Sequence, residues 1–506
     1  MLHHEARMPM TSPRPKKLIL VELNEITWRF VDPLIKEGAL PNFATLIRQG
    51  TRGTPIADEQ GADLDPWVSW TTVYTGRKAA DHGVRFLEQP PETVKGPRIW
   101  DIVADLGRPV GVFGSIMSWP PRRDVTGYWV PGTFSPGPET FPAELGPIQQ
   151  LNLTYTRDHS PVPGQARQRI GKFTLVRKLR GLGLRVATLA RIAAFFVRGA
   201  LGSAKAWEKV SMQPLINFDF FQKLWKRHQP HFATFHTNHV AHYQHRFWRS
   251  ADPAPFLVPP SAREVSDFGG AIRFGYQVAD ELLGRVMAMV DDDTVVLVAS
   301  GLSQQPYVTD EFPDGRSVLR IRDIDQVVDL LGAAGHCRAY AVMATQWNLD
   351  FDDAQSLQAA SRAIAGATVG AQAHELFAHT IVGNTISINI RQKLPRPIDG
   401  DADCVFPATG RSVKMRELCA EQDATTKQGY HDRPGVLIVA GPGIAAGLDI
   451  GECSTLDLAP TMLSVLGIEA PGYMTGAVLQ RIFSDRDTTA TLGQAVERKE
   501  ALHEPA

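Results

Sequence analysis

The sequence is poor in cysteine and contains no long apolar run. Only four cysteines occur among 506 residues, at positions 337, 404, 419 and 453, and none forms a Cys-x-x-Cys pair. This scatter excludes a disulfide framework and a zinc ribbon and is typical of a reducing compartment. No window approaches the roughly 18 uninterrupted apolar residues of a membrane-spanning helix. We therefore exclude a membrane-spanning role.

An excess of charge of one sign is also missing. The formal net charge is -1, which gives no electrostatic reason to expect a nucleic-acid partner. The first residues are polar, and the apolar core of a secretory signal does not follow them. We expect a cytoplasmic protein with a disordered tip at residues 1–16 and a flexible tail at residues 486–506.

Short apolar runs alternate with segments of helical periodicity along most of the chain. The runs are apolar throughout, which indicates strands covered on both faces and hence a mainly parallel sheet between helical layers. They are Leu18–Leu23, Val110–Phe113, His231–Phe235, Thr294–Ala299, Thr385–Ile390 and Val436–Ala440. We expect one α/β domain over residues 17–485, with ligands bound beyond the carboxyl ends of the strands.

One basic segment, residues 167–209, interrupts this alternation. It carries eleven Lys or Arg residues and one acidic residue, Glu208. Its apolar residues recur at helical spacing, although Gly181, Gly183 and Gly199 weaken a continuous helix. We expect a helical, basic insertion that covers part of the α/β domain at about residues 160–212. Three roles stay open: a solvated face packed on the same protein, peripheral contact with an anionic membrane, or binding of a polyanionic or lipid-linked substrate.

Six motifs in a fixed order resemble a known family. They are LILVELNEITWRFVDPLIKEGALPNFATLIRQG, PWVSWTTVYTGRKAADHGV, TNHVAHYQHRFW, DTVVLVASGLSQ, GYHDRPGVLIVAGPGI and TLDLAPTMLSVLGIEAP. Together they resemble the type I phosphodiesterase and nucleotide pyrophosphatase branch of the alkaline phosphatase superfamily. The resemblance covers most of the chain apart from the basic segment, and it implies an alkaline-phosphatase-like α/β fold.

The resemblance also implies two zinc-like ions that bind a phosphate, one of which activates a Thr or Ser nucleophile. At the first ion, the family aspartate corresponds to Asn24, the nucleophile to Pro66, and an Asp-His pair to Gly301 and Leu302. Proline, glycine and leucine offer no side-chain donor, and a neutral amide is a poor zinc ligand. We therefore expect the first ion and the standard nucleophile to be absent.

The positions of the second ion keep more of their chemistry. They correspond to Asn238, His242 and His431, so both histidines remain, and four histidines fall within residues 236–245. We expect one divalent cation, zinc or manganese, bound by these three residues with an open position for water. The alternative is that the histidines only pack their rings and satisfy backbone groups.

Further polar residues lie beside the vacated positions. The catalytic candidates are Asp65, Glu25, Ser69 and His245. The candidates for substrate binding are Asn24, Gln304, Gln305 and His239. Asp65 and Glu25 are the candidates for a general base, although Asp65 could instead cap the segment that follows it. His82 is expected to support its own loop.

Two functions follow from these residues. The first is a hydrolase or transferase that acts on a phosphate-type ester of a small anionic or lipid-linked substrate through a rebuilt, mononuclear metal site. The alternative is a catalytically silent relative that binds an anionic ligand or partner in a glycan or lipid biosynthetic system. The surviving histidines on separate segments favour the enzyme.

Overall fold

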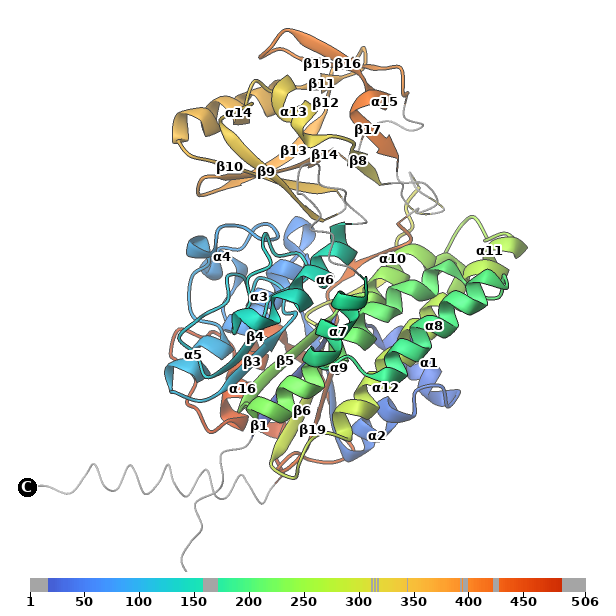
Figure 1. Ribbon diagram of the computed structural model, residues 1–506, viewed down its shortest axis with the longest axis vertical. Coiled ribbons are helices and arrows are strands. Elements are labelled where there is room, and N and C mark those ends of the chain that lie inside the picture. The colour runs from blue at the N-terminus through green and yellow to red at the C-terminus, as the bar shows by residue number, and fades with distance from the viewer. Residues whose placement is uncertain are drawn as a thin grey trace, which may run out of the picture.

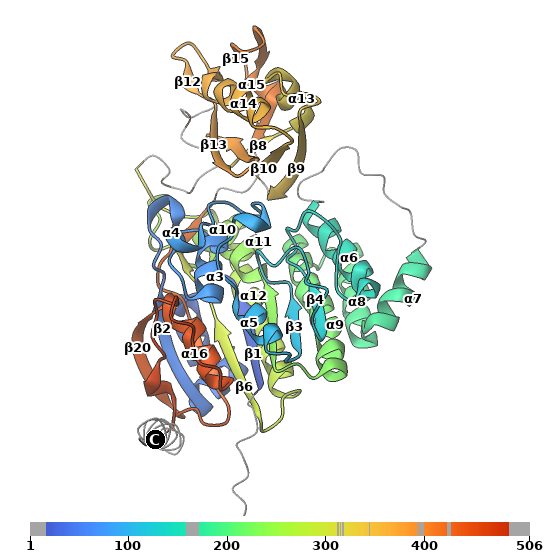
Figure 2. The same cartoon turned by 90° about the vertical axis from the view of Figure 1, so that its left-hand side faces the viewer.

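The computed structural model describes residues 17–157 and 172–484, with short gaps at 311–312, 314, 316–317, 344, 392–393, 395–398 and 422–426. The predicted N-terminal tip, the C-terminal tail and the start of the basic segment lie outside the described residues. The described part forms a large α/β domain and a smaller unit at one end of it (Figures 1 and 2).

An eight-stranded sheet forms the centre of the α/β domain, in the order β20-β2-β19-β6-β1-β5-β3-β4. The strands are β1 (Lys17–Leu23), β2 (Gly50–Ile56), β3 (Val110–Phe113), β4 (Gly127–Val130), β5 (Phe232–Thr237), β6 (Thr294–Ala299), β19 (Leu437–Ala440) and β20 (Leu448–Ser454). Strand β1 pairs in parallel with β5 and β6, whereas β19 runs antiparallel to β2 and β6. The sheet is therefore mainly parallel, as predicted, and the strands that end near Asn24, His236 and Ser300 are neighbours in it.

Helices cover both faces of this sheet, and each face has its own apolar core. One core receives side chains from α1 (Trp28–Lys36), α2 (Pro41–Gln49), α9 (Met212–His228), α10 (His239–Ala251) and α12 (Ala271–Met287). The other receives them from α3 (Pro66–Thr75), α5 (Ile99–Asp105) and α16 (Leu458–Val465). Strands buried on both faces need no polar alternation, which explains their continuous apolar runs.

Residues 307–428 form the smaller unit, which we call the cap domain. Its helices and strands are β8 (Leu319–Ile321), α13 (Ile324–Leu330), β9 (Cys337–Met343), β10 (Gln346–Phe351), α14 (Ala354–Gly366), β11 (Thr368–Val369), β12 (His374–Glu375), β13 (Phe377–Val382), β14 (Thr385–Ile390), β15 (Asp403–Phe406), β16 (Arg411–Lys414), α15 (Met415–Leu418) and β17 (Cys419–Glu421). It has a separate apolar core.

The cap domain corrects one sequence-based prediction. The run Thr385–Ile390 was expected in the central sheet, but it is strand β14 of an antiparallel sheet in the order β13-β14-β10-β9. A short apolar run is compatible with a strand of the central parallel sheet. It is equally compatible with a strand of an antiparallel sheet that packs on a separate core. Residues 17–485 therefore contain two units with separate cores, whereas the sequence indicated one.

Two paired strands join the cap domain to the α/β domain. Strand β7 (Ser303–Pro306) leads out and strand β18 (Gly429–Asp432) leads back. They run antiparallel, with Gln304 opposite His431. Side chains from both connections therefore reach the end of the central sheet at which strands β1 and β6 finish.

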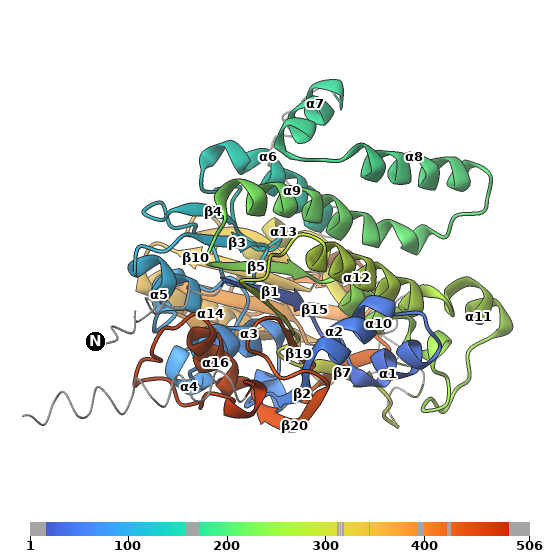
Figure 3. The ribbon, with the colours of Figure 1, turned by 90° about the horizontal axis from the view of Figure 1, so that it is seen from below.

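The described part of the basic segment is helical, as predicted, but broken. Helix α7 (Lys172–Leu182) ends before Gly183, whose φ of +132° lies in a region that other residues rarely adopt. Helix α8 (Val186–Ala200) then runs along the outside of α9 (Figure 3). Within the described residues, no helix is both long and apolar enough to cross a membrane.

The cap domain contacts the loop after α4 (Ala79–His82) in the α/β domain. Nδ2 of Asn348 donates to the backbone oxygens of Leu87 and Glu88, at 3.2 and 3.3 Å. The Glu88 side chain is 5% exposed, and its Oε1 has no hydrogen-bond partner among the described residues. Burial, only partly offset by the charge of Arg98, raises the pKa of Glu88 to about 8.

Replacing Glu88 by glutamine should stabilise the fold more at pH 8 than at pH 5. The folded protein keeps Glu88 protonated up to about pH 8, whereas the unfolded chain releases this proton above about pH 4.3. The stability contributed by protonation is therefore lost as the pH rises through this window, at about 1.4 kcal/mol per unit of pKa difference. Thermal melts of both proteins at both pH values measure it. An equal difference in melting temperature at pH 5 and pH 8 would contradict the burial argument.

Candidate active site

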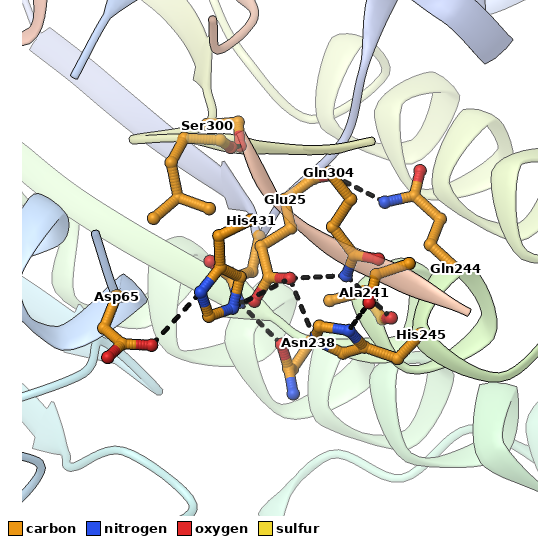
Figure 4. A network of polar contacts seen from close by, with 12 residues as sticks. Glu25, Asp65, Asn238, Ala241, Gln244, His245, Ser300, Gln304 and His431 are labelled. Carbon is orange, nitrogen blue, oxygen red and sulfur yellow. Dashed lines mark hydrogen bonds and ion pairs between the residues drawn. The ribbon is translucent and has the colours of Figure 1, made fainter. Parts of the chain in front are cut away.

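Three ligand-type side chains from distant segments meet at the end of the central sheet (Figure 4). Glu25 follows strand β1, His245 lies on helix α10, and His431 lies on strand β18. One carboxylate oxygen and one nitrogen from each ring lie within 4.8 Å of one another. Oε2 of Glu25 is 3.1 Å from Nε2 of His245 and 3.6 Å from Nε2 of His431. We call these residues the Glu-His-His cluster.

The backbone of Glu25 is held in an unusual conformation. Its φ is +61°, which is uncommon for a residue other than glycine and is found at functional sites where the surroundings enforce it. Nε2 of Gln244 donates to the Glu25 backbone oxygen at 2.7 Å, and Oε1 of Gln244 accepts from the Tyr276 hydroxyl at 2.7 Å. These buried contacts fix the turn after β1, so the carboxylate faces α10 and β18.

Both imidazole rings are oriented by backbone carbonyls. Nδ1 of His245 lies 2.9 Å from the oxygen of Gly429, and Nδ1 of His431 lies 2.9 Å from the oxygen of Leu64. Since a carbonyl oxygen only accepts hydrogen bonds, each Nδ1 carries the proton. In the neutral ring, Nε2 then has a lone pair directed at Glu25. Metal-binding histidines are oriented in the same way in proteins.

The Glu25 carboxylate depends on positive charge from its neighbours. Burial raises the pKa of Glu25, but the charges of His245 and His431 and hydrogen bonds from His245 and Gln304 outweigh it and hold this pKa at about 2. Burial lowers the pKa of His245, against the attraction of Glu25. The low pKa of Glu25 therefore depends on a cation between its carboxylate and the rings. A ring proton supplies this charge when the imidazoles are protonated, and a metal ion would take its place when they are neutral.

The donor set fits one divalent cation. Carboxylate oxygen and imidazole nitrogen are both zinc and manganese ligands. Ligand atoms that share a tetrahedral zinc ion lie roughly 3.3 Å apart, close to the 3.1 and 3.6 Å separations from Glu25. The Gln304 side chain donates from Nε2 to Glu25 and to the backbone oxygen of Ala241, while its buried Oε1 has no partner among the described residues.

Two asparagines lie next to the cluster. Nδ2 of Asn24 donates to Oε1 of Glu25 at 2.9 Å and to Oδ1 of Asn238 at 2.7 Å. Its Oδ1 accepts from the indole nitrogen of Trp70 at 2.8 Å. Asn24 thus uses both ends of its amide to position Glu25, a role for which an amide suits better than a carboxylate.

Asp65 contacts the cluster through His431. Its Oδ1 lies 3.1 Å from Nδ1 of His431, and its side chain is 25% exposed. Asp65 occupies the N-cap position of α3, but its side chain makes no capping hydrogen bond. The carboxylate is therefore available to orient His431 and to face solvent at the site.

The predicted ligand His242 lies outside the Glu-His-His cluster. Nε2 of His242 lies 3.4 Å from a guanidinium nitrogen of Arg246 on the same helix. The histidine one turn later, His245, faces Glu25 instead. The family spacing from Asn238 pointed to His242, and only the position of β18, whose Gly429 carbonyl binds His245, distinguishes the two rings.

Two candidates for substrate binding, His239 and Gln305, do not face the cluster. His239 is buried, with Nδ1 2.8 Å from the Thr237 hydroxyl and Nε2 3.0 Å from the Gly275 oxygen, and burial lowers its pKa to about 4. It therefore has no ring nitrogen left for substrate. Gln305 is exposed and, by strand alternation, points away from Gln304 and the cluster.

Ser69 belongs to a separate buried network. Its hydroxyl donates to Oε2 of Glu59 at 3.0 Å. The Thr72 hydroxyl donates to the other Glu59 oxygen and lies 3.1 Å from Nε2 of His82, whose Nδ1 accepts from the backbone of Val84. This network supports α3 and its following loop, which agrees with the supporting role expected for His82.

Comparison with known families adds a finding to this geometry. The sequence model for type I phosphodiesterase / nucleotide pyrophosphatase matches residues 18–331, more than half of the chain. The chain belongs to this family, a branch of the alkaline phosphatase superfamily. The matched range contains Glu25, Asp65, His245 and Gln304, while His431 lies beyond it.

The chain is also similar, at low sequence identity, to solved structures of other proteins. Phosphonoacetate hydrolase from Sinorhizobium meliloti 1021, in complex with phosphonoacetate, is 13% identical with a TM-score of 0.40, over 89% of this chain and 96% of that one. An inactive murine ectonucleotide pyrophosphatase / phosphodiesterase 5 in complex with AMP is 11% identical with a TM-score of 0.40, over 93% of this chain and 100% of that one. No curated protein compared with the chain matches it.

The positions expected for the family's first ion contain no group that could hold it. Pro66 is the buried first residue of α3, and Leu302 is fully buried. A Cβ on Gly301 would lie 3.5 to 3.6 Å from atoms of Ser69, so this turn packs closely on α3. The side-chain amide of Asn24 is already hydrogen-bonded to Trp70, Glu25 and Asn238. The type I phosphodiesterase two-ion arrangement therefore does not fit these side chains.

Proposed function

We propose that the chain is a hydrolase or transferase that acts on a phosphate-type ester through one divalent cation held by the Glu-His-His cluster. The observation that carries this proposal is the convergence of the Glu25 carboxylate with two imidazole nitrogens whose opposite ring nitrogens are anchored on carbonyls. Membership of a family of phosphodiesterases and pyrophosphatases supplies the substrate class.

Each residue has a role in this chemistry. A bound cation would supply Lewis acidity and offset negative charge on a phosphoryl group. Glu25, His245 and His431 would hold it, and Asn24 and Gln304 fix the Glu25 carboxylate by hydrogen bonds. Asp65 orients His431 and, being partly exposed, can accept a proton from an attacking water. The substrate would be a small anionic or lipid-linked ester.

The alternative function is a catalytically silent relative that binds an anionic ligand. Its specific support is Pro66, which offers no hydroxyl at the position of the family nucleophile. Such a protein would bind metal or ligand at the cluster without turnover. Direct attack by water needs no enzyme nucleophile, which is why Pro66 is compatible with the enzyme as well.

Removal of a bound cation should destabilise the protein. A ligand at a hundredfold excess over its dissociation constant stabilises the fold by about 2.7 kcal/mol, so a chelator should lower the melting temperature and added zinc or manganese should restore it. The variants Glu25→Gln, His245→Ala and His431→Ala should each lose this response. Differential scanning calorimetry with and without EDTA measures it.

Two control variants make this test specific. His242→Ala should keep the chelator response, because this ring lies outside the cluster. His82→Ala should lower stability, because it breaks the contact with Thr72, and should also keep the response. A wild-type protein that contains no metal and ignores EDTA would refute the mononuclear site. Loss of the response in His242→Ala together with its retention in His245→Ala would refute the choice of ligands.

Turnover should proceed without a covalent phospho-enzyme. Since proline cannot act as a nucleophile, bis-nitrophenyl phosphate should give weak or undetectable turnover and no burst phase in rapid-mixing experiments. Any turnover should depend on added metal and should be lost in Glu25→Gln. A stoichiometric burst would show that another side chain is phosphorylated and would contradict this mechanism.

A further inference from the structure

Helix α8 exposes an apolar face to solvent. Its residues lie three or four positions apart and so share one side of the helix and its C-cap. They are Val186, Ala190, Ala193, Val197 and Leu201. All five are exposed, with Val186 at 58%, Val197 at 59% and Leu201 at 76%. Phe196, beside this face, is 62% exposed. A surface helix of a globular protein normally turns charged and polar residues outward.

The opposite side of α8 already has its partners within the protein. Thr188 is buried, and Leu189 and Ile192 pack on the core that α9 shares with the central sheet. The outward apolar face is therefore additional to the face that anchors the helix. Figure 3 shows α7 and α8 as the outermost layer beyond α9. A contiguous exposed apolar surface of this kind marks an interaction site.

The charges around this face select an anionic partner. Arg177, Lys178, Arg180 and Arg185 are exposed on α7 and on the turn before α8. Between residues 172 and 209 the one acidic residue is Glu208, which pairs with Arg198. Exposed apolar side chains on α8, with exposed cations on the preceding helix and turn, match an anionic lipid surface. There the apolar face enters the boundary between headgroups and acyl chains, and the cations stay at the headgroups.

We propose that helices α7 and α8 dock the protein on an anionic lipid surface. A second copy of this chain is a poorer occupant, because pairing two α8 faces would bring the same four cations of each copy together. Neither helix spans the bilayer, since α8 has 15 residues and lies along the surface of the domain. This inference is independent of the proposed catalytic function.

Sedimentation with vesicles tests the proposal on the full chain. The protein should pellet with vesicles of phosphatidylcholine containing phosphatidylglycerol and stay in the supernatant with phosphatidylcholine alone. Binding should fall as salt is raised, because the headgroup charges are screened. The double variant Val197→Glu/Leu201→Glu should lose binding, and Arg177→Glu/Arg180→Glu should weaken it at least about tenfold.

Leu106→Glu is the matched control. Leu106 is also a highly exposed apolar residue, at 56%, but it follows α5 on another part of the α/β domain, so this variant should bind as the wild type does. Since all substituted side chains are exposed, circular dichroism and melting temperature should be unchanged.

Equal binding to both kinds of vesicle, or no binding to either, would overturn the proposal. A dimer in sedimentation velocity that Val197→Glu/Leu201→Glu dissociates would assign the face to a second copy instead.

Discussion

The buried carboxylate of Glu25 needs positive charge beside it, and much of the site's architecture serves this need. Its side chain is 3% exposed, its backbone has a positive φ, and its pKa of about 2 keeps it ionised. An isolated buried carboxylate would be costly, so it persists only with partners. Those partners come from the end of β1, from α10 and from both connections to the cap domain.

This constraint links the site to the arrangement of the two domains. Gln304 and His431 face each other on β7 and β18, the two strands that join the cap domain to the α/β domain. The return strand is also bound to α10, because the backbone nitrogen of Gln428 donates to the His245 oxygen and Gly429 accepts from its ring. A Cβ on Gly429 would lie 2.7 Å from the backbone oxygen of Gln244 on α10, so glycine allows this close approach. The two strands that connect the domains therefore form one wall of the site.

Much of this could be predicted from local sequence patterns, and the remainder depends on tertiary contacts. Continuous apolar runs indicated the parallel sheet, and the motif order placed Glu25, Asp65 and His431 near one another. The choice between His242 and His245 could not be made, because both lie on the same helix and only the distant Gly429 carbonyl orients the second ring. Likewise, no local pattern shows that Thr385–Ile390 packs on a separate core.

Anomalous diffraction from crystals soaked with zinc or manganese tests the central claim most directly. The account predicts one peak per chain, within bonding distance of Oε2 of Glu25 and Nε2 of both His245 and His431. A second peak at Asn24 and Gly301 should be missing, since those residues lack the donors of the family's first ion. A cluster without a peak, or a peak bound by His242 in place of His245, would contradict the account.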